Sequence, residues 1–114
     1  MIELGYWIKE TNPRPNASGV SADKAITIAF TQEINRHTLN ARNILILNAS
    51  QGGKLISDLF LFHYETESRT LHIYWNEDAS TPEPNSRIEV ILTGRIANYR
   101  NEMMKVPFHL CFSI

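Results

Sequence analysis

The last nine residues, Val106-Pro107-Phe108-His109-Leu110-Cys111-Phe112-Ser113-Ile114, place an apolar side chain at every second position. Side chains that alternate in this way lie on opposite faces of a β-strand, so we expect one face of this segment to be buried. The same spacing recurs at 26–30, 71–75 and 88–92, and no long segment with helical spacing comes between them. The chain is therefore predicted to be all-β, an antiparallel sandwich of two packed sheets.

About seven strands are predicted, separated by segments rich in Gly, Pro, Asn and Ser. Pro13 and Pro15 end the first strand because proline lacks a backbone donor. The alternation is lost between residues 32 and 42, where we expect one short helical turn that crosses between the sheets. Residues 44–47 are all aliphatic, as expected where both faces of a strand are covered. The predicted strands are 2–9, 25–31, 43–48, 55–64, 69–75, 86–93 and 106–114.

The core is predicted from the apolar positions of these strands. Truncation of either of two members, Phe30 or Phe108, to alanine is expected to cost about 3–5 kcal/mol. The predicted core residues are Ile26, Ile28, Phe30, Leu71, Ile73, Trp75, Val90, Leu92, Phe108, Leu110 and Phe112.

Composition favours a folded chain with one core. The 114 residues include 43% hydrophobic and 20% charged residues, close to ordinary globular usage. We expect a single domain over residues 1–114, excised from a longer protein, because both ends of the chain fall on predicted strands. The lone Cys111 cannot form a disulfide within the domain.

Charge and hydropathy exclude several classes of partner. Eleven basic and twelve acidic residues give a formal net charge of −1. The basic residues are scattered, so no nucleic-acid partner is expected. No segment approaches the length of a membrane-spanning helix and the first residues do not resemble a signal peptide, so direct membrane insertion is not expected.

Neither a metal site nor a catalytic site is predicted. The histidines do not have the spacing of zinc ligands, and the acidic clusters lie in predicted loops without the regular oxygen spacing of a calcium loop. No nucleophile elbow and no phosphate-binding glycine loop is present. No cofactor is therefore expected. The side chains considered are His37, His63, His72 and His109, and the clusters Glu65 with Glu67, and Glu77 with Asp78 and Glu83.

Three aromatic residues are the best candidates for an interface. Trp7 and Tyr74 fall on the polar face of predicted strands, and Tyr99 lies in a predicted connection. Exposed rings can stack on a sugar or anchor a protein partner. Packing of Trp7 and Tyr74 against a neighbouring domain or a long loop is an equally good interpretation.

Four fragments, taken in order, resemble the bacterial immunoglobulin-like domain found in S-layer and other surface proteins. The family has a proline, a polar stretch and Gly-Val before its second strand, and then a segment like Phe-Ser-Glu-Pro-Met-Asp-x-x-Thr-Leu. It also has an Arg-Thr-Leu strand and a Pro-Gly-Thr-x-Tyr-x-Val entry into the sixth strand. The matching segments here are 15–20 before 25–30, 30–39, 69–73 and 84–90.

The chain departs from the family pattern in two places. Where many members have Asp-x-x-Gly-Asn, this chain has Asn98-Tyr99-Arg100-Asn101, without the acidic residue and the glycine. Ile88 stands where the family has a tyrosine in the sixth strand. The resemblance therefore does not carry over a calcium or turn-fixing role for that aspartate.

The resemblance implies an immunoglobulin-like sandwich that serves as a non-enzymatic structural or adhesive spacer in a bacterial cell-surface or secreted protein. Its location would be extracellular or in the cell envelope. Its partners would be neighbouring domains of the same polypeptide, and a protein or glycan at the cell surface. The alternative is a carbohydrate-binding accessory module of a secreted glycoside-degrading enzyme, which would need an aromatic platform such as Trp7 or Tyr74.

Overall fold

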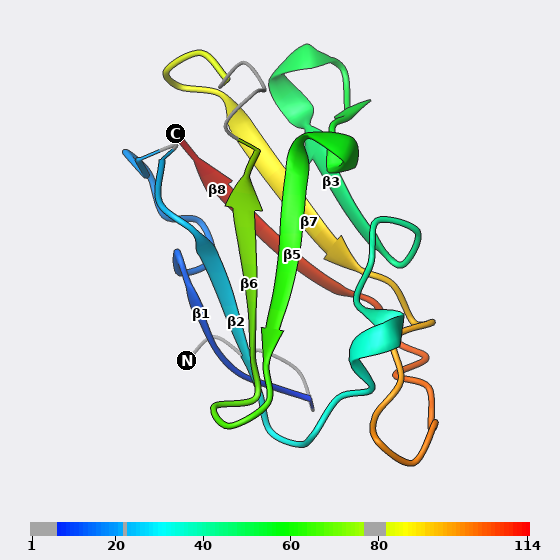
Figure 1. The fold of residues 1–114 in the computed structure, drawn as a ribbon. Helices are drawn as coiled ribbons and strands as arrows, with labels where there is room; N and C mark the ends of the chain where they lie inside the picture. Colours follow the sequence, from blue (N-terminus) through cyan, green and yellow to red (C-terminus); the bar gives the residue numbers. More distant parts are fainter. Residues whose placement is uncertain (1–6, 22, 77–81) are drawn as a thin grey trace.

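The computed structural model describes residues 7–21, 23–76 and 82–114. Two four-stranded antiparallel sheets pack face to face, with orders β1-β2-β6-β5 and β4-β3-β7-β8 (Figure 1). The predicted immunoglobulin-like sandwich is thus confirmed. The strands are β1 (Ile8–Asn12), β2 (Ile26–Phe30), β3 (Ile44–Asn48), β4 (Lys54–Leu55), β5 (Phe60–Glu65), β6 (Thr70–Trp75), β7 (Arg87–Leu92) and β8 (Phe108–Ser113). Short 3₁₀ helices are η1 (Arg36–Thr38), η2 (Ala49–Gln51) and η3 (Ser57–Leu59).

The predicted strand over 55–64 is wrong, because the chain changes sheets within it. β4 pairs with β3 in one sheet, whereas β5 pairs with β6 in the other. The crossover is η3, where the buried Ser57 hydroxyl accepts a 2.8 Å hydrogen bond from the Ile46 N–H. Ile56 and Phe60 on either side are both buried and lie an even number of residues apart, so a single strand interrupted only at Ser57 and Asp58 fits the sequence equally well.

The first strand also differs from its prediction. β1 extends to Asn12, and residues 2–6 of the predicted strand lie outside the described residues. A bulge between Ile8 and Glu10 shifts its register against β2. Beside this bulge Trp7 is only 8% exposed, so its predicted place on the polar face is wrong.

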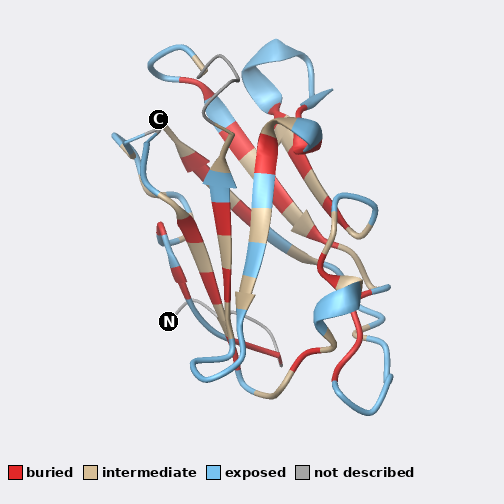
Figure 2. Ribbon diagram, in the orientation of Figure 1, coloured by how far each residue is buried: buried red, intermediate tan, exposed pale blue. Residues whose placement is uncertain are grey.

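The core lies between the two sheets, where buried residues alternate along the strands (Figure 2). Most predicted core residues are confirmed, but Trp75 and Phe108 are only partly buried and pack at its margin. Val106, which shares their spacing, is 75% exposed. The aliphatic run in β3 has one buried face and one less buried face, and Leu45 and Leu47 lie on the less buried one. Core residues that the prediction missed include Ile8, Ile34, Leu39, Ile44, Ile46, Ile56, Phe60, Ile88 and Ile96.

Two connections meet at one end of the sandwich. Residues 31–43 join β2 to β3 and contain the expected helical turn, η1, which the Asn35 side chain caps by accepting from His37 N–H. Residues 93–107 join β7 to β8 and carry the buried Ile96. An added Cβ on Gly94 would lie 2.7 Å from the Lys105 carbonyl carbon, so only glycine fits where this connection folds back.

No helix among the described residues has the length and apolar character needed to cross a lipid bilayer.

Truncation of Phe30 tests the position of the core. Phe30 is 2% exposed, so Phe30→Ala should lower the free energy of unfolding by about 3–5 kcal/mol through lost burial and a cavity. Phe108→Ala should cost clearly less, because Phe108 is only partly buried. Urea unfolding followed by tryptophan fluorescence measures both; equal losses would contradict this core.

Candidate functional site

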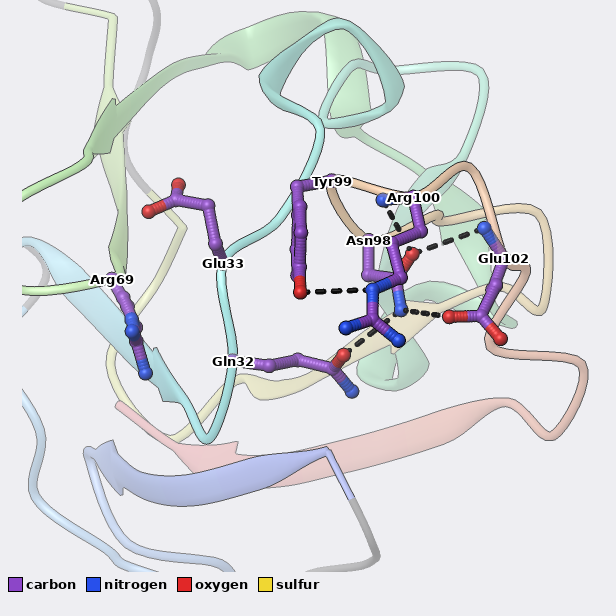
Figure 3. A pocket seen from close by; sticks show the side chains of 7 residues that line it. All are labelled: Gln32, Glu33, Arg69, Asn98, Tyr99, Arg100 and Glu102. Atoms are coloured by element: carbon purple, nitrogen blue, oxygen red, sulfur yellow. Dashed lines mark hydrogen bonds between the residues drawn. The ribbon is translucent and has the colours of Figure 1, made fainter.

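A cavity of about 440 Å³ opens at the end of the sandwich where the two long connections meet (Figure 3). It draws side chains from the β2–β3 connection, the β5–β6 loop and the β7–β8 connection. The lining residues are Gln32, Glu33, Arg69, Asn98, Tyr99, Arg100 and Glu102.

Asn98 joins the two connections from inside this end of the molecule. The residue is 4% exposed, and its Nδ2 donates to Gln32 Oε1 at 2.9 Å and to Glu102 Oε1 at 3.1 Å. Its Oδ1 accepts from the backbone N–H groups of Arg100 (2.9 Å) and Glu102 (3.0 Å). Every hydrogen-bonding atom of the buried amide therefore has a partner, as a buried polar group requires.

Asn101 completes the turn that Asn98 begins. Its φ of 62° lies in the left-handed region, which asparagine tolerates better than most residues other than glycine. Its Oδ1 also accepts a 2.8 Å hydrogen bond from Asn35 Nδ2. Asn98 and Asn101 thus fix this turn without the aspartate and glycine of the pattern that the sequence resembles.

Tyr99 presents its ring at the surface of the cavity. The residue is 56% exposed, and its backbone N–H donates to the Glu33 carbonyl at 3.0 Å. Arg100 Nε donates to Tyr99 Oη at 2.9 Å, and the guanidinium carbon lies 5.2 Å from the ring centroid. The ring stands between Glu33 on one side and Arg100 on the other in Figure 3.

Glu33 and Arg69 form the opposite wall. Tyr64 Oη donates to Glu33 Oε1 at 2.8 Å and accepts from the Ile34 N–H at 3.1 Å. Burial, reinforced by the bond to Glu33, raises the pKa of Tyr64 to about 12, so its phenol stays neutral at physiological pH. Arg69, at the end of the hairpin loop, has a φ of 52° and its Nη1 lies 3.4 Å from the Thr31 carbonyl oxygen.

The chemistry of this cavity suits binding. Two guanidinium groups and two carboxylates line it, so its formal charges cancel. Amide and guanidinium donors and carboxylate acceptors line it together with one exposed aromatic ring. Cysteine, serine and histidine, the usual nucleophile and base, are absent from its lining residues.

The structure does not bring the three predicted interface residues together. Trp7 belongs to the core cluster, and Tyr99 lies at the cavity. Tyr74 is 41% exposed on the outer face of β6, opposite Leu61 of β5 and stacked on His72 with ring centroids 6.0 Å apart. Arg69, which lines the cavity, directly precedes β6. Tyr74 lies about four residues further along that strand, outside the cavity. An interface role for Tyr74 or Tyr99 stays a prediction.

Two of the histidines singled out in the sequence, His63 and His72, are cross-strand neighbours with ring centroids 6.1 Å apart. His72 Nε2 lies 3.4 Å from Glu65 Oε2, and His109 Nδ1 lies 2.9 Å from Glu89 Oε1. Glu77 and Asp78 lie outside the described residues. Within the part of the chain that the structure describes, no three His, Cys, Asp or Glu side chains form a group able to hold a metal ion.

Sequence reasoning missed Gln32, Glu33, Arg69 and Glu102 as site residues. The available signal was the altered motif at 98–101, which departs from the family pattern at the very turn that carries Tyr99. What the sequence did not show is that residues 31–35 lie against this turn, joined by the bridge between Ile34 and Asn98.

Comparisons with known proteins agree on one fold. The family model for the bacterial Ig-like domain matches residues 6–113. The N-terminal part of the bacterial S-layer protein SbsC superposes with a TM-score of 0.64 at 10% identity, covering 93% of this chain and 22% of that one. Domains 1–6 of the surface layer protein SbsC give 0.61 at 11% identity, covering 94% of this chain and 13% of that one. Curated protein sequences give no match.

Removal of the Asn98 side chain tests its role at this end of the molecule. Asn98→Ala leaves the N–H groups of Arg100 and Glu102 without their acceptor, and should lower the free energy of unfolding by about 1–3 kcal/mol. Asn40→Ala, at a partly buried position where it removes only local turn bonds, serves as a control in chemical denaturation. An Asn98→Ala loss no larger than the control's would show that backbone contacts alone hold the turn.

Proposed function

Because the chain belongs to the bacterial Ig-like domain family, we propose that it is a non-catalytic structural module of a longer bacterial cell-surface or secreted protein. In this role it holds neighbouring domains of the same polypeptide at a fixed distance. The observation that carries the proposal is a sandwich with one continuous core, whose first and last described residues, Trp7 and Ile114, lie at opposite ends.

The first and last described residues lie at opposite ends of the sandwich. Trp7 lies beside Thr31, whose N–H donates to the Trp7 carbonyl at 2.8 Å, near the cavity. Ile114 lies at the other end, where its N–H donates to the Ser86 carbonyl at 2.9 Å. A domain connected in this way adds its own length to a chain of domains, and the largest dimension of this one is 39 Å.

The similar structures support a place within a longer polypeptide. In the S-layer chains, a domain of this fold is only a small part of the whole. The Ig-like sandwich also suits a spacer, because its two sheets share one packed interior that holds the shape of the domain. An extracellular or envelope location follows from this proposal.

The side chains of the cavity support a non-catalytic role. Asn98 is fully engaged in hydrogen bonds that hold the loops, and Tyr64, whose pKa is raised, sits beneath Glu33 as a neutral donor. Catalysis would need a reactive group free to exchange protons or attack a substrate. These groups instead maintain structure.

Replacement within the parent protein tests the spacer role. Residues 7–114 are exchanged for an unrelated Ig-like domain of similar length, and in a second strain they are deleted. A spacer depends on length and not on sequence, so the exchange should preserve surface display and function of the parent, and the deletion should impair them. Protease accessibility on intact cells measures the display.

If the parent protein with the exchanged domain is displayed normally but loses its function, the result would contradict a pure spacer role. It would assign a specific activity to this domain. Protection of the native domain from protease in intact cells, with cleavage after lysis, would contradict the surface location.

A further inference from the structure

We propose that the end cavity binds a neutral sugar residue of a glycan, stacked on the free face of Tyr99 and hydrogen-bonded by Gln32, Glu33 and Arg69 (Figure 3). The sugar site is independent of the spacer role, because a module can hold its neighbours apart whether or not its end binds a ligand.

Tyr99 has the properties of a stacking platform. One side of its ring is occupied by Arg100, which also holds the hydroxyl at 2.9 Å, while the residue as a whole is 56% exposed. The backbone of Tyr99 is fixed by the 3.0 Å bond to the Glu33 carbonyl. A ring held in this way offers a flat apolar surface with little conformational entropy left to lose on binding.

The facing wall supplies oriented hydrogen-bonding groups. Gln32 Oε1 accepts from Asn98 Nδ2, which fixes the amide and turns its two N–H donors away from Asn98. Glu33 Oε1 accepts from Tyr64, which leaves Oε2 as an acceptor, with no bond to another described residue. The Arg69 guanidinium uses one N–H in a long contact and retains its other donors. Sugar hydroxyl groups both donate and accept, so they match this mixed set.

The charge of the cavity selects among ligands. Arg69 and Arg100 balance Glu33 and Glu102, so a polyanion such as nucleic acid or a sulfated glycan gains no net attraction. A protein partner would need an apolar centre to its interface, and here a single ring is surrounded by charged and amide groups. The volume of about 440 Å³ is within the range of roughly 300–1,000 Å³ found for small-molecule sites. A neutral sugar residue fits all three constraints.

The cavity is also organised before any ligand arrives. The bridge between Ile34 and Asn98, the Asn35 to Asn101 bond and the four bonds of the Asn98 amide hold the two connections together. Binding therefore requires little ordering of loops. Because the entropy cost of ordering is small, weak contacts to a sugar can give measurable affinity.

An NMR titration of the isotope-labelled protein with cellobiose, chitobiose and mannobiose tests the proposal. At least one of these neutral disaccharides should shift the resonances of Gln32, Tyr99 and Arg69 together. Tyr99→Ala should weaken that binding about ten-fold or more through loss of the stacking surface, while Tyr99→Phe keeps the ring and should retain binding. Tyr74→Ala is the matched control, because Tyr74 is an exposed tyrosine outside the cavity, and it should bind as the unaltered protein does.

Three results would overturn the proposal. These are no shift in the cavity with any neutral disaccharide, binding that Tyr99→Ala leaves unchanged, or a response confined to a sulfated or uronic-acid disaccharide. The shifts of the unaltered protein decide the location of the site even if Tyr99→Ala fails to fold. None of these results alters the outcome of the domain exchange, so the two proposals fail separately.

Discussion

Apolar side chains from the two facing sheets interlock into one interior, and every other feature of the molecule depends on this contact. Ile28 and Leu71 on one sheet, and Ile46, Val90 and Leu110 on the other, are completely buried. Each sheet alone would expose one apolar face to water, so neither is stable without its partner. With no disulfide possible from a single cysteine, burial must supply the stability.

The end of the sandwich that carries the cavity is a second, polar layer built on this core. Ile34 and Ile96 are buried beneath the two connections and anchor them to the sheets. Above them, Asn98 ties residues 31–35 to residues 98–102. The position of Tyr99 therefore follows from the core through a short series of packed and hydrogen-bonded contacts. A domain that is rigid enough to space its neighbours is, for the same reason, rigid enough to present a preformed binding surface.

The sequence predicted what depends on local periodicity and missed what depends on long-range contacts. Alternation in β2, β6, β7 and β8 correctly gave the strands and most of the core. The crossover at Ser57 was missed because Ile56 and Phe60 on either side keep the same parity, and the burial of Trp7 was missed because Trp7 lies in a bend before β1, where strand alternation does not apply. Tyr99 was found as an exposed ring, but Glu33 and Arg69 come from segments more than 25 residues away in the chain, and no local pattern joins them.

Native-state amide hydrogen exchange tests the shared interior most directly. If the two sheets stabilise one another, the amides of Ile28 and Leu71 in one sheet and of Ile46 and Val90 in the other should exchange through the same opening, with one free energy equal to that of global unfolding. A clearly lower opening free energy for the amides of one sheet, with protection retained in the other, would contradict a single cooperative core.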